Sequence, residues 1–261
     1  MRGSWQRRID RAEHLAADGG PAASLLLFYT RLLRRQKAVY DSFNSRRPCG
    51  SLDLDLALVM SGCSALLRDV IEHGPEPLAV DARALLAMTD STIADRLLTC
   101  WCTPSGCEFF PKAMLQPYGQ WLADMRITPS DRSGMRTDNR CPFCGGVPQL
   151  SILETVSEAT SADGGGRQLL CATCLTTWPF RRVLCAHCGE EDERRLGYFQ
   201  SPAFSHLRVD ACDTCQHYLK TVDLTRVGLA VPLVDEVAGG ALDIWASEHG
   251  YEKIELNLLG L

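Results

Sequence analysis

The stretch CATCLTTWPFRRVLCAHC, residues 171–188, holds two Cys-x-x-Cys pairs, and the stretches CPFCG at 141–145 and CDTC at 212–215 hold two more. Two residues between a pair of cysteines form one tight turn that aims both sulfur atoms at a single ion. One pair supplies only half of a tetrahedron, so a second pair must complete it. The four pairs therefore predict two complete four-thiolate metal sites.

The order of the pairs indicates how they combine. The segment repeats with an offset of about 44 residues, and in each copy a pair followed by glycine comes first and a pair without glycine comes second. This alternation favours two sequential sites over a crossed arrangement that joins the first pair to the third. The predicted ligands are Cys141, Cys144, Cys171 and Cys174 in the first site and Cys185, Cys188, Cys212 and Cys215 in the second.

These metal sites would also stabilise the segment that contains them. Each copy is too short to bury a sufficient core, and metal binding supplies folding free energy to such small modules. Short β-branched or aromatic runs lie between the pairs, which is typical of tandem rubredoxin-like or zinc-ribbon modules. Zinc and iron both accept four thiolates in a tetrahedron, so the spacing does not choose between the two metals.

The remainder of the chain has a mainly helical pattern. Leu25, Phe28, Leu32 and Val39 recur at helical spacing, although the alternation of apolar and acidic residues over 52–56 leaves a short strand open there. The predicted fold class is α+β. Its parts are an all-helical domain at 1–127, a polar linker at 128–140, a first rubredoxin-like module at 141–184, a second at 185–226, and a C-terminal helix and tail at 227–261.

Charge and hydropathy limit the partners and the location. The formal net charge of the 261 residues is −5, which argues against nucleic acid as the main partner. No apolar run reaches the ~18 residues of a membrane span, and no secretory signal is evident. We therefore expect a cytoplasmic protein without membrane insertion. Because cytosolic thiols stay reduced, metal binding is a better explanation of the 13 cysteines than disulfides.

A few cysteines and histidines outside the expected ligand set leave alternatives open. Cys100, Cys102 and Cys107 cluster in TCWCTPSGCE, where packing near a helix end is favoured over a third metal or a reactive thiol. His187 lies inside the third pair and His217 just after the fourth. Each histidine is either an exposed side chain, which the pattern favours, or a spare ligand or redox tuner.

Several catalytic signatures are missing from the sequence. It has no Walker loop, no dinucleotide-binding glycine fingerprint and no nucleophile elbow. A hydrolytic zinc site keeps an open coordination position, which four cysteines would close. We therefore predict no catalytic residues and no enzyme activity.

The chain resembles the FdhE family, the formate dehydrogenase accessory proteins. The resemblance is specific from Cys141 onward and looser in the N-terminal helices, and the final ELNLLGL departs from the Asn-Pro-Phe-like ending common in the family. Beyond the four pairs, the shared residues are Trp178, Arg182, Asp213, Tyr218, Leu219, Lys220, Asp235, Ala238, Leu242 and Asp243.

The resemblance implies a cytoplasmic accessory factor that binds the catalytic subunit of a molybdenum- or tungsten-dependent formate dehydrogenase and helps to bring it to an active state. It also makes iron the first choice of metal, with zinc as the alternative. Two other functions stay open. One is a rubredoxin-like electron-transfer or redox-sensing protein. The other is a nucleic-acid-binding zinc ribbon. It is less favoured, because the chain is acidic and its strands carry few basic residues among the aromatic ones.

Overall fold

The fold is α+β, as the sequence predicts, in a computed structural model that describes residues 4–43, 46–103, 105–132, 138–155 and 166–261. The helices are α1 (Ser4–Ala17), α2 (Ala23–Ser42), α3 (Leu52–Met60), α4 (Cys63–His73), α5 (Glu76–Leu86), α6 (Asp90–Cys102), α7 (Phe109–Asp124), α8 (Pro232–Ala238) and α9 (Gly240–Glu248). The strands are β1 (Pro148–Leu153), β2 (Arg167–Cys171), β3 (Thr177–Pro179), β4 (Leu196–Gln200), β5 (Leu207–Cys212), β6 (His217–Asp223) and β7 (Glu252–Lys253).

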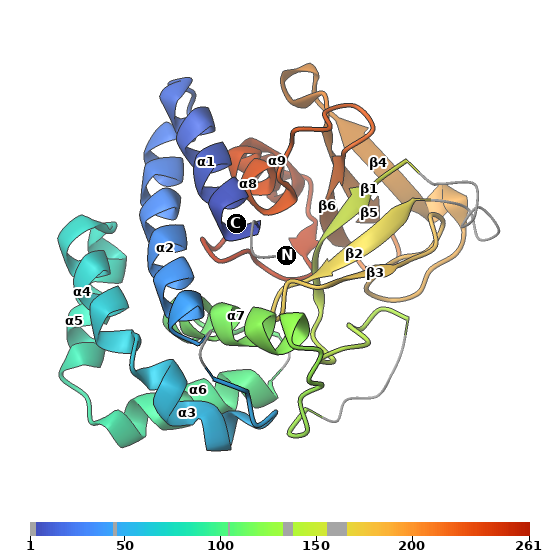
Figure 1. Cartoon of the computed structure of the whole chain (residues 1–261). Helices are drawn as coiled ribbons and strands as arrows, with labels where there is room; N and C mark the ends of the chain where they lie inside the picture. Colours follow the sequence, from blue (N-terminus) through green and yellow to red (C-terminus); the bar gives the residue numbers. More distant parts are fainter. Residues whose placement is uncertain (1–3, 44–45, 104, 133–137, 156–165) are drawn as a thin grey trace.

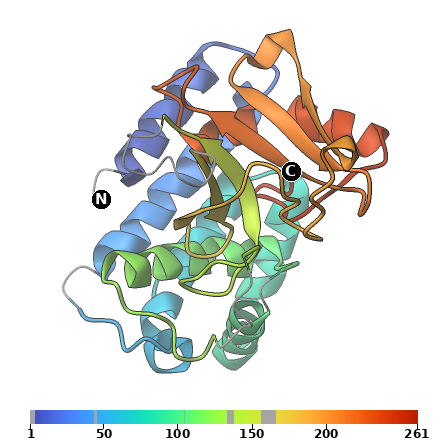
Figure 2. The same ribbon diagram turned by 90° about the vertical axis from the view of Figure 1, so that its right-hand side faces the viewer.

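Helices and strands occupy opposite sides of the molecule. Figure 1 shows α1 to α7 on one side and the sheet on the other, with α8 and α9 between α1 and the strands. Figure 2 views the molecule from the sheet side, where the yellow and orange strands lie in front of the blue and teal helices. Helix α8 connects the two parts, because it contacts α1 and α2 as well as β1 and β6, whereas α9 packs on β5 and β7.

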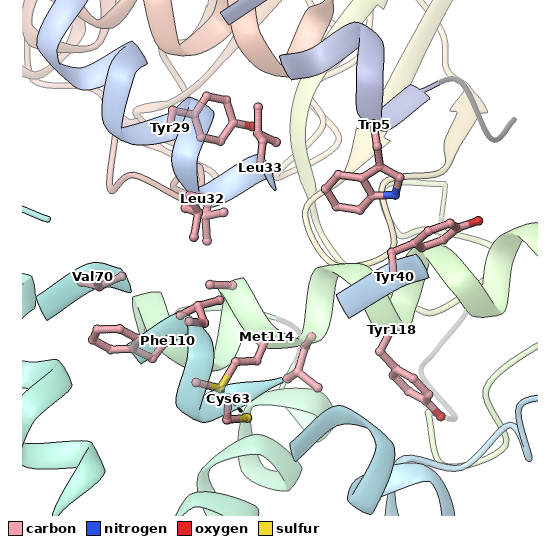
Figure 3. Close-up of a cluster of buried hydrophobic side chains, with 14 of the residues drawn as sticks. Trp5, Tyr29, Leu32, Leu33, Tyr40, Cys63, Val70, Phe110, Met114 and Tyr118 are labelled. Carbon is pink, nitrogen blue, oxygen red and sulfur yellow. Dashed lines mark hydrogen bonds between the residues drawn. The ribbon is translucent and has the colours of Figure 1, made fainter. Parts of the chain in front are cut away.

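The largest apolar cluster holds the helices together. Figure 3 shows Tyr29 and Leu32 from α2, Cys63 from α4, and Phe110 and Met114 from α7 gathered in this core. Helix α7 lies at its centre, because every residue from 110 to 122 is buried. A helix that is buried on all sides has neighbours on every face. Here the other helices cover one side of α7, and the first cysteine cluster lies against another.

The sheet consists of two similar three-stranded units, one for each repeat of the cysteine pairs. The antiparallel strands β1, β2 and β3 follow the first pair, and the antiparallel strands β4, β5 and β6 follow the third. The two three-stranded units join through a parallel pairing of β1 with β6, which gives the order β3-β2-β1-β6-β5-β4. The two modules therefore form one continuous sheet.

Two local expectations differ from the structure. Residues 52–60 form helix α3, so the short strand left open over 52–56 is wrong; Leu52 and Val59 are buried in the helical core. The single helix expected after residue 227 is divided into α8 and α9 at Gly239, where a Cβ atom would stand 2.5 Å from Leu207 Cδ1. The close approach of β5 explains why the chain turns at a glycine there.

The helices of the described residues include none that is long and apolar enough to cross a membrane. The boundaries between the domains stay predictions.

Candidate metal centres

The first cluster contains the sulfur atoms of Cys141, Cys144, Cys171 and Cys174. The Sγ–Sγ distances are 3.6 Å from Cys141 to Cys174, 3.5 Å from Cys144 to Cys171 and 3.4 Å from Cys144 to Cys174. Two of these cysteines precede β1 and the other two follow along β2 and its turn. The antiparallel pairing of β1 with β2 therefore brings the two turns together at one end of the hairpin.

The second cluster contains Cys185, Cys188, Cys212 and Cys215. The Sγ–Sγ distances are 3.8 Å from Cys185 to Cys215 and 3.7 Å from Cys188 to Cys212. The first pair precedes β4, and the second lies in the turn between β5 and β6. The structure thus groups the pairs sequentially, and the crossed arrangement does not occur.

The sulfur spacing in both clusters fits a tetrahedral metal site. Four thiolates at about 2.3 Å from one ion lie about 3.8 Å apart. The measured distances of 3.4 to 3.8 Å approach that value, whereas a disulfide bond is about 2.05 Å long. Burial raises the pKa of the Cys171 and Cys174 thiols well above the ordinary value, because the thiolate form is penalised in the interior. A cation among the four sulfurs would remove that penalty.

Each cysteine pair lies in a turn whose backbone is held by the same bonds. The amides of Gly145, Leu175, Gly189 and Gln216 each donate to the carbonyl of the first cysteine of the pair before them. All four of these residues have positive φ values, between 57° and 78°. Glycine adopts this conformation without strain, and the other two positions show that the turn imposes it on any residue. The four turns are therefore one repeated structure.

The first cluster is closed off from solvent. All four of its cysteines are buried, and Thr176 Oγ1 lies 2.6 Å from Cys174 Sγ and 3.4 Å from Cys141 Sγ. Helix α7 covers one side, where Gln116 Nε2 donates to the carbonyl of Ala172 at 3.1 Å. The role of Thr176 was not foreseen from the sequence. Its place two residues after the second pair of the module would have been the signal.

The second cluster is open on one side. Cys188 is exposed and Cys215 is half-buried. A cavity of about 100 Å³ adjoins Cys185 and Cys212, and Arg167, Arg182 and Arg208 contribute to its lining. The two clusters therefore share ligand type and geometry but differ in how far solvent reaches them.

The two histidines near the second cluster lie side by side. Their rings stack with centroids 3.7 Å apart and planes at 12°. Each offers one ring nitrogen, and these two atoms and Cys215 Sγ lie within 4.8 Å of one another. His187 is exposed, as the sequence pattern favoured, and His217 is half-buried. Their closeness to Cys215 keeps the role of spare ligands a prediction.

Two cysteines at and after the end of α6 form a disulfide, so the expectation that the cysteines outside the metal sites stay reduced is wrong for this pair. Cys100 is bonded to Cys107, while Cys102 is exposed and reduced. The bond closes a short loop between α6 and α7. The structure therefore does not support a metal site shared by Cys100, Cys102 and Cys107. Cys63 is buried in the helical core.

Several known proteins that are similar to this chain carry the name FdhE. The family model described as "FdhE, C-terminal domain" matches residues 183–259. A protein of Aquifex aeolicus called "Protein FdhE homolog" is 30% identical over 203 residues, which is 75% of this chain and 68% of that protein. A protein of the same name from Shewanella oneidensis is 26% identical over 280 residues, which covers 98% of this chain and 87% of that protein.

A solved structure matches the whole arrangement of helices and strands. The crystal structure of the FdhE protein from Pseudomonas aeruginosa superposes with a TM-score of 0.70 at 25% sequence identity, over 99% of this chain and 96% of that one. The match extends the relationship across the helical part, where the sequence resemblance is loose. The sequence identity with the Aquifex aeolicus protein and the fold shared with the Pseudomonas aeruginosa protein show that the chain belongs to the FdhE family.

Proposed function

We propose that this chain is a cytoplasmic accessory factor that matures formate dehydrogenase by binding its catalytic subunit, and that it is not itself an enzyme. The observation that carries the proposal is the likeness to FdhE proteins over nearly the whole chain. The two cysteine clusters support it, because four thiolates close the coordination sphere of an ion. Neither centre would then keep the open position that metal-dependent hydrolysis needs.

In this proposal the eight paired cysteines are ligands of two metal ions. The sulfur spacing supports a tetrahedral ion in each cluster. Iron is the first choice because the family resemblance implies it, and zinc is the second because it accepts the same four thiolates. The ions stabilise the sheet and fix the shape of the surface around the turns.

The test is genetic complementation combined with protein detection. Deleting the gene is expected to abolish formate dehydrogenase activity while the catalytic subunit is still synthesised, and the wild-type gene restores the activity. The double variants Cys141→Ser/Cys144→Ser and Cys185→Ser/Cys188→Ser each remove two ligands of one centre. The formate dehydrogenase activity that each variant restores compares the contributions of the two centres. Normal formate dehydrogenase activity in the deletion strain would overturn the proposal.

A second candidate function is rubredoxin-like electron transfer or redox sensing. The observation that favours it is the exposure of Cys188 in the second cluster, because electrons reach an ion most easily where its ligands meet solvent. Iron changes its oxidation state in such a centre, and zinc does not. A visible absorption spectrum of the aerobically purified full-length protein shows whether the centres contain iron, as this function requires. A colourless protein that contains two zinc ions removes this candidate.

A further inference from the structure

A hydrogen bond to the backbone fixes the tautomer of the His217 ring. Its Nδ1 atom lies 2.7 Å from the carbonyl oxygen of Cys215. A carbonyl oxygen only accepts hydrogen bonds, so Nδ1 carries the proton and donates it. In the neutral ring the lone pair is then on Nε2. Metal-binding histidines are characteristically fixed in this way, by a hydrogen bond from the other ring nitrogen to a backbone carbonyl or a carboxylate.

Three donor atoms meet beside the open face of the second cluster. The ring nitrogens of His187 and His217 and the sulfur of Cys215 lie within 4.8 Å of one another. Zinc–nitrogen and zinc–sulfur bonds of about 2.0 and 2.3 Å place such ligands about 3.5 Å apart. Because the three atoms lie within 4.8 Å of one another, a contraction of at most about 1.3 Å brings them to that spacing. Rotation of the exposed His187 ring out of its stack on His217 can provide it.

A carboxylate lies next to this group. Glu252, on the strand β7 that pairs with the start of β6, places its Oε2 atom 4.0 Å from His217 Nε2. Its side chain is exposed and is free to approach a cation from the solvent side. Two imidazoles, one thiolate and a nearby carboxylate form a donor set that suits zinc and ferrous iron.

The first module lacks both histidines at the matching positions. Phe143 stands where His187 stands in the third pair, and Thr176 stands where His217 follows the fourth. Phe143 packs against the core around the first cluster, and Thr176 bonds to its sulfurs. The same turn therefore carries residues that close off the cluster in the first module and two histidines in the second.

We propose that His187, His217 and Cys215 form a third, solvent-facing site for a divalent metal ion, through which the ion of the second centre enters and leaves. The inference rests on the metal-binding part of the proposed function. On entry, the ion first binds the two imidazoles and the Cys215 sulfur. It keeps the sulfur bond while the other three cysteines replace the imidazoles, and the thiol protons of all four cysteines go to solvent. The oxidation state of the ion does not change.

The test measures zinc binding and zinc release with the full-length protein. Wild-type protein is expected to hold two zinc ions tightly and a third more weakly. A chromophoric chelator is expected to remove zinc in a fast phase from the second centre and a slow phase from the first. The double variant His187→Phe/His217→Thr copies the first module. It should lose the third ion and slow the fast phase by about tenfold or more, the effect expected from losing metal-orienting groups.

Two further variants make the result decisive. His249→Phe replaces a histidine that stacks on Trp245 and lies outside the donor group, so it should leave both measurements unchanged. His187→Ala alters only one exposed side chain and should also abolish binding of the third ion. It therefore replaces the double variant in this test if the double variant does not fold.

The outcomes separate this inference from the proposed function. Fewer than two tightly held ions in the wild type would overturn the metal centres and the inference together. Two tight ions with an unchanged third ion or an unchanged fast phase in the histidine variants would overturn the inference alone.

Discussion

At the scale of single residues, the first cluster depends on a glycine that leaves room for two sulfur atoms. A Cβ atom on Gly146 would stand 2.8 Å from Cys171 Sγ and 3.3 Å from Cys144 Sγ. These distances are shorter than a carbon–sulfur van der Waals contact, so the sulfur atoms must shift if a side chain is added at this position. The geometry of the four thiolates is therefore tied to this one position.

We predict that Gly146→Ala weakens metal binding at the first centre by about tenfold or more, the scale seen when groups around a metal site are disturbed. Metal content after dialysis against a chelator measures the effect. Gly228→Ala is the matched control, because the nearest atom to its added Cβ, the carbonyl oxygen of Leu224, is 3.9 Å away. Equal metal retention in the two variants would contradict the prediction.

A buried charged network joins the sheet to the C-terminal segment. Glu236, on α8, is fully buried and pairs with Lys220 of β6 and Lys253 of β7. Asn257 Nδ2 also donates to Glu236 Oε2 at 2.7 Å. Burial raises the pKa of this carboxyl, but the two lysines outweigh burial and lower it to about 2 from the ordinary value of 4.5. The carboxylate therefore stabilises the fold in its charged form.

We predict that Glu236→Gln lowers the free energy of unfolding by about 3 to 5 kcal/mol, because it leaves two buried ammonium groups short of a partner. Urea denaturation measures the change. The exposed pair of Arg34 with Glu13 supplies the control, since Glu13→Gln should cost less than about 1 kcal/mol. In the wild type, this contribution is present above pH 4.5 and is lost as the pH falls toward 2. Similar costs for the two variants would show that the network is not stabilising.

At the scale of elements, helix α7 is the contact between the helical core and the first cluster. A Cβ atom on Gly119 would lie 2.9 Å from the carbonyl oxygen of Thr173 and 3.0 Å from Cys174 Cα. These are backbone atoms of the second cysteine turn, which cannot rotate away as a flexible side chain would. The glycine thus lets the helix pack directly on the turn.

We predict that Gly119→Val destabilises the protein by about 1 to 3 kcal/mol, the usual cost of inserting atoms into a packed interior. It should also change the absorption of cobalt bound at the first centre and leave that of the second unchanged. Ala84→Val on the exposed face of α5 controls for the weaker helix propensity of valine. An unchanged cobalt spectrum with normal stability would refute the close packing.

At the scale of the whole molecule, one end of the sheet is an edge strand with an exposed aromatic side chain. Strand β4 is the terminal strand of the described sheet, and Tyr198 on it is 67% exposed. An edge strand presents backbone groups that a strand of another protein can pair with, and exposed aromatic side chains are frequent interface anchors. The cavity beside the second cluster adjoins the same strand.

If the chain binds the formate dehydrogenase catalytic subunit as proposed, Tyr198→Glu is predicted to lower recovery of that subunit in co-purification by about tenfold or more, as the loss of an aromatic anchor does in other interfaces. Leu54→Glu on α3 is the matched control, because Leu54 is 70% exposed on the helical side. The two variants should differ in recovery and not in stability. If Tyr198→Glu recovers as much subunit as Leu54→Glu, the partner binds elsewhere.

The sequence was sufficient where a structure depends on neighbours along the chain. The grouping of the eight cysteines, the two repeated modules and the helical first half all follow from spacing and periodicity. The division between α8 and α9 was missed, because it depends on Leu207, which is more than 30 residues from Gly239 in the sequence. The disulfide between Cys100 and Cys107 was missed because the expected cytosolic location argued against disulfides, and cysteine spacing alone does not distinguish a disulfide from packing or metal binding.

By itself, the sequence determined which sulfur atoms could share an ion, because the turn between two cysteines is local and repeats four times. Only the tertiary structure decided how the centres differ. Helix α7 covers one cluster, the parallel pairing of β1 with β6 merges the modules into one sheet, and the strands bring His187 and His217 together beside the other cluster. These contacts join segments that are distant in the chain, and their energies depend on shape and burial, which no local pattern specifies.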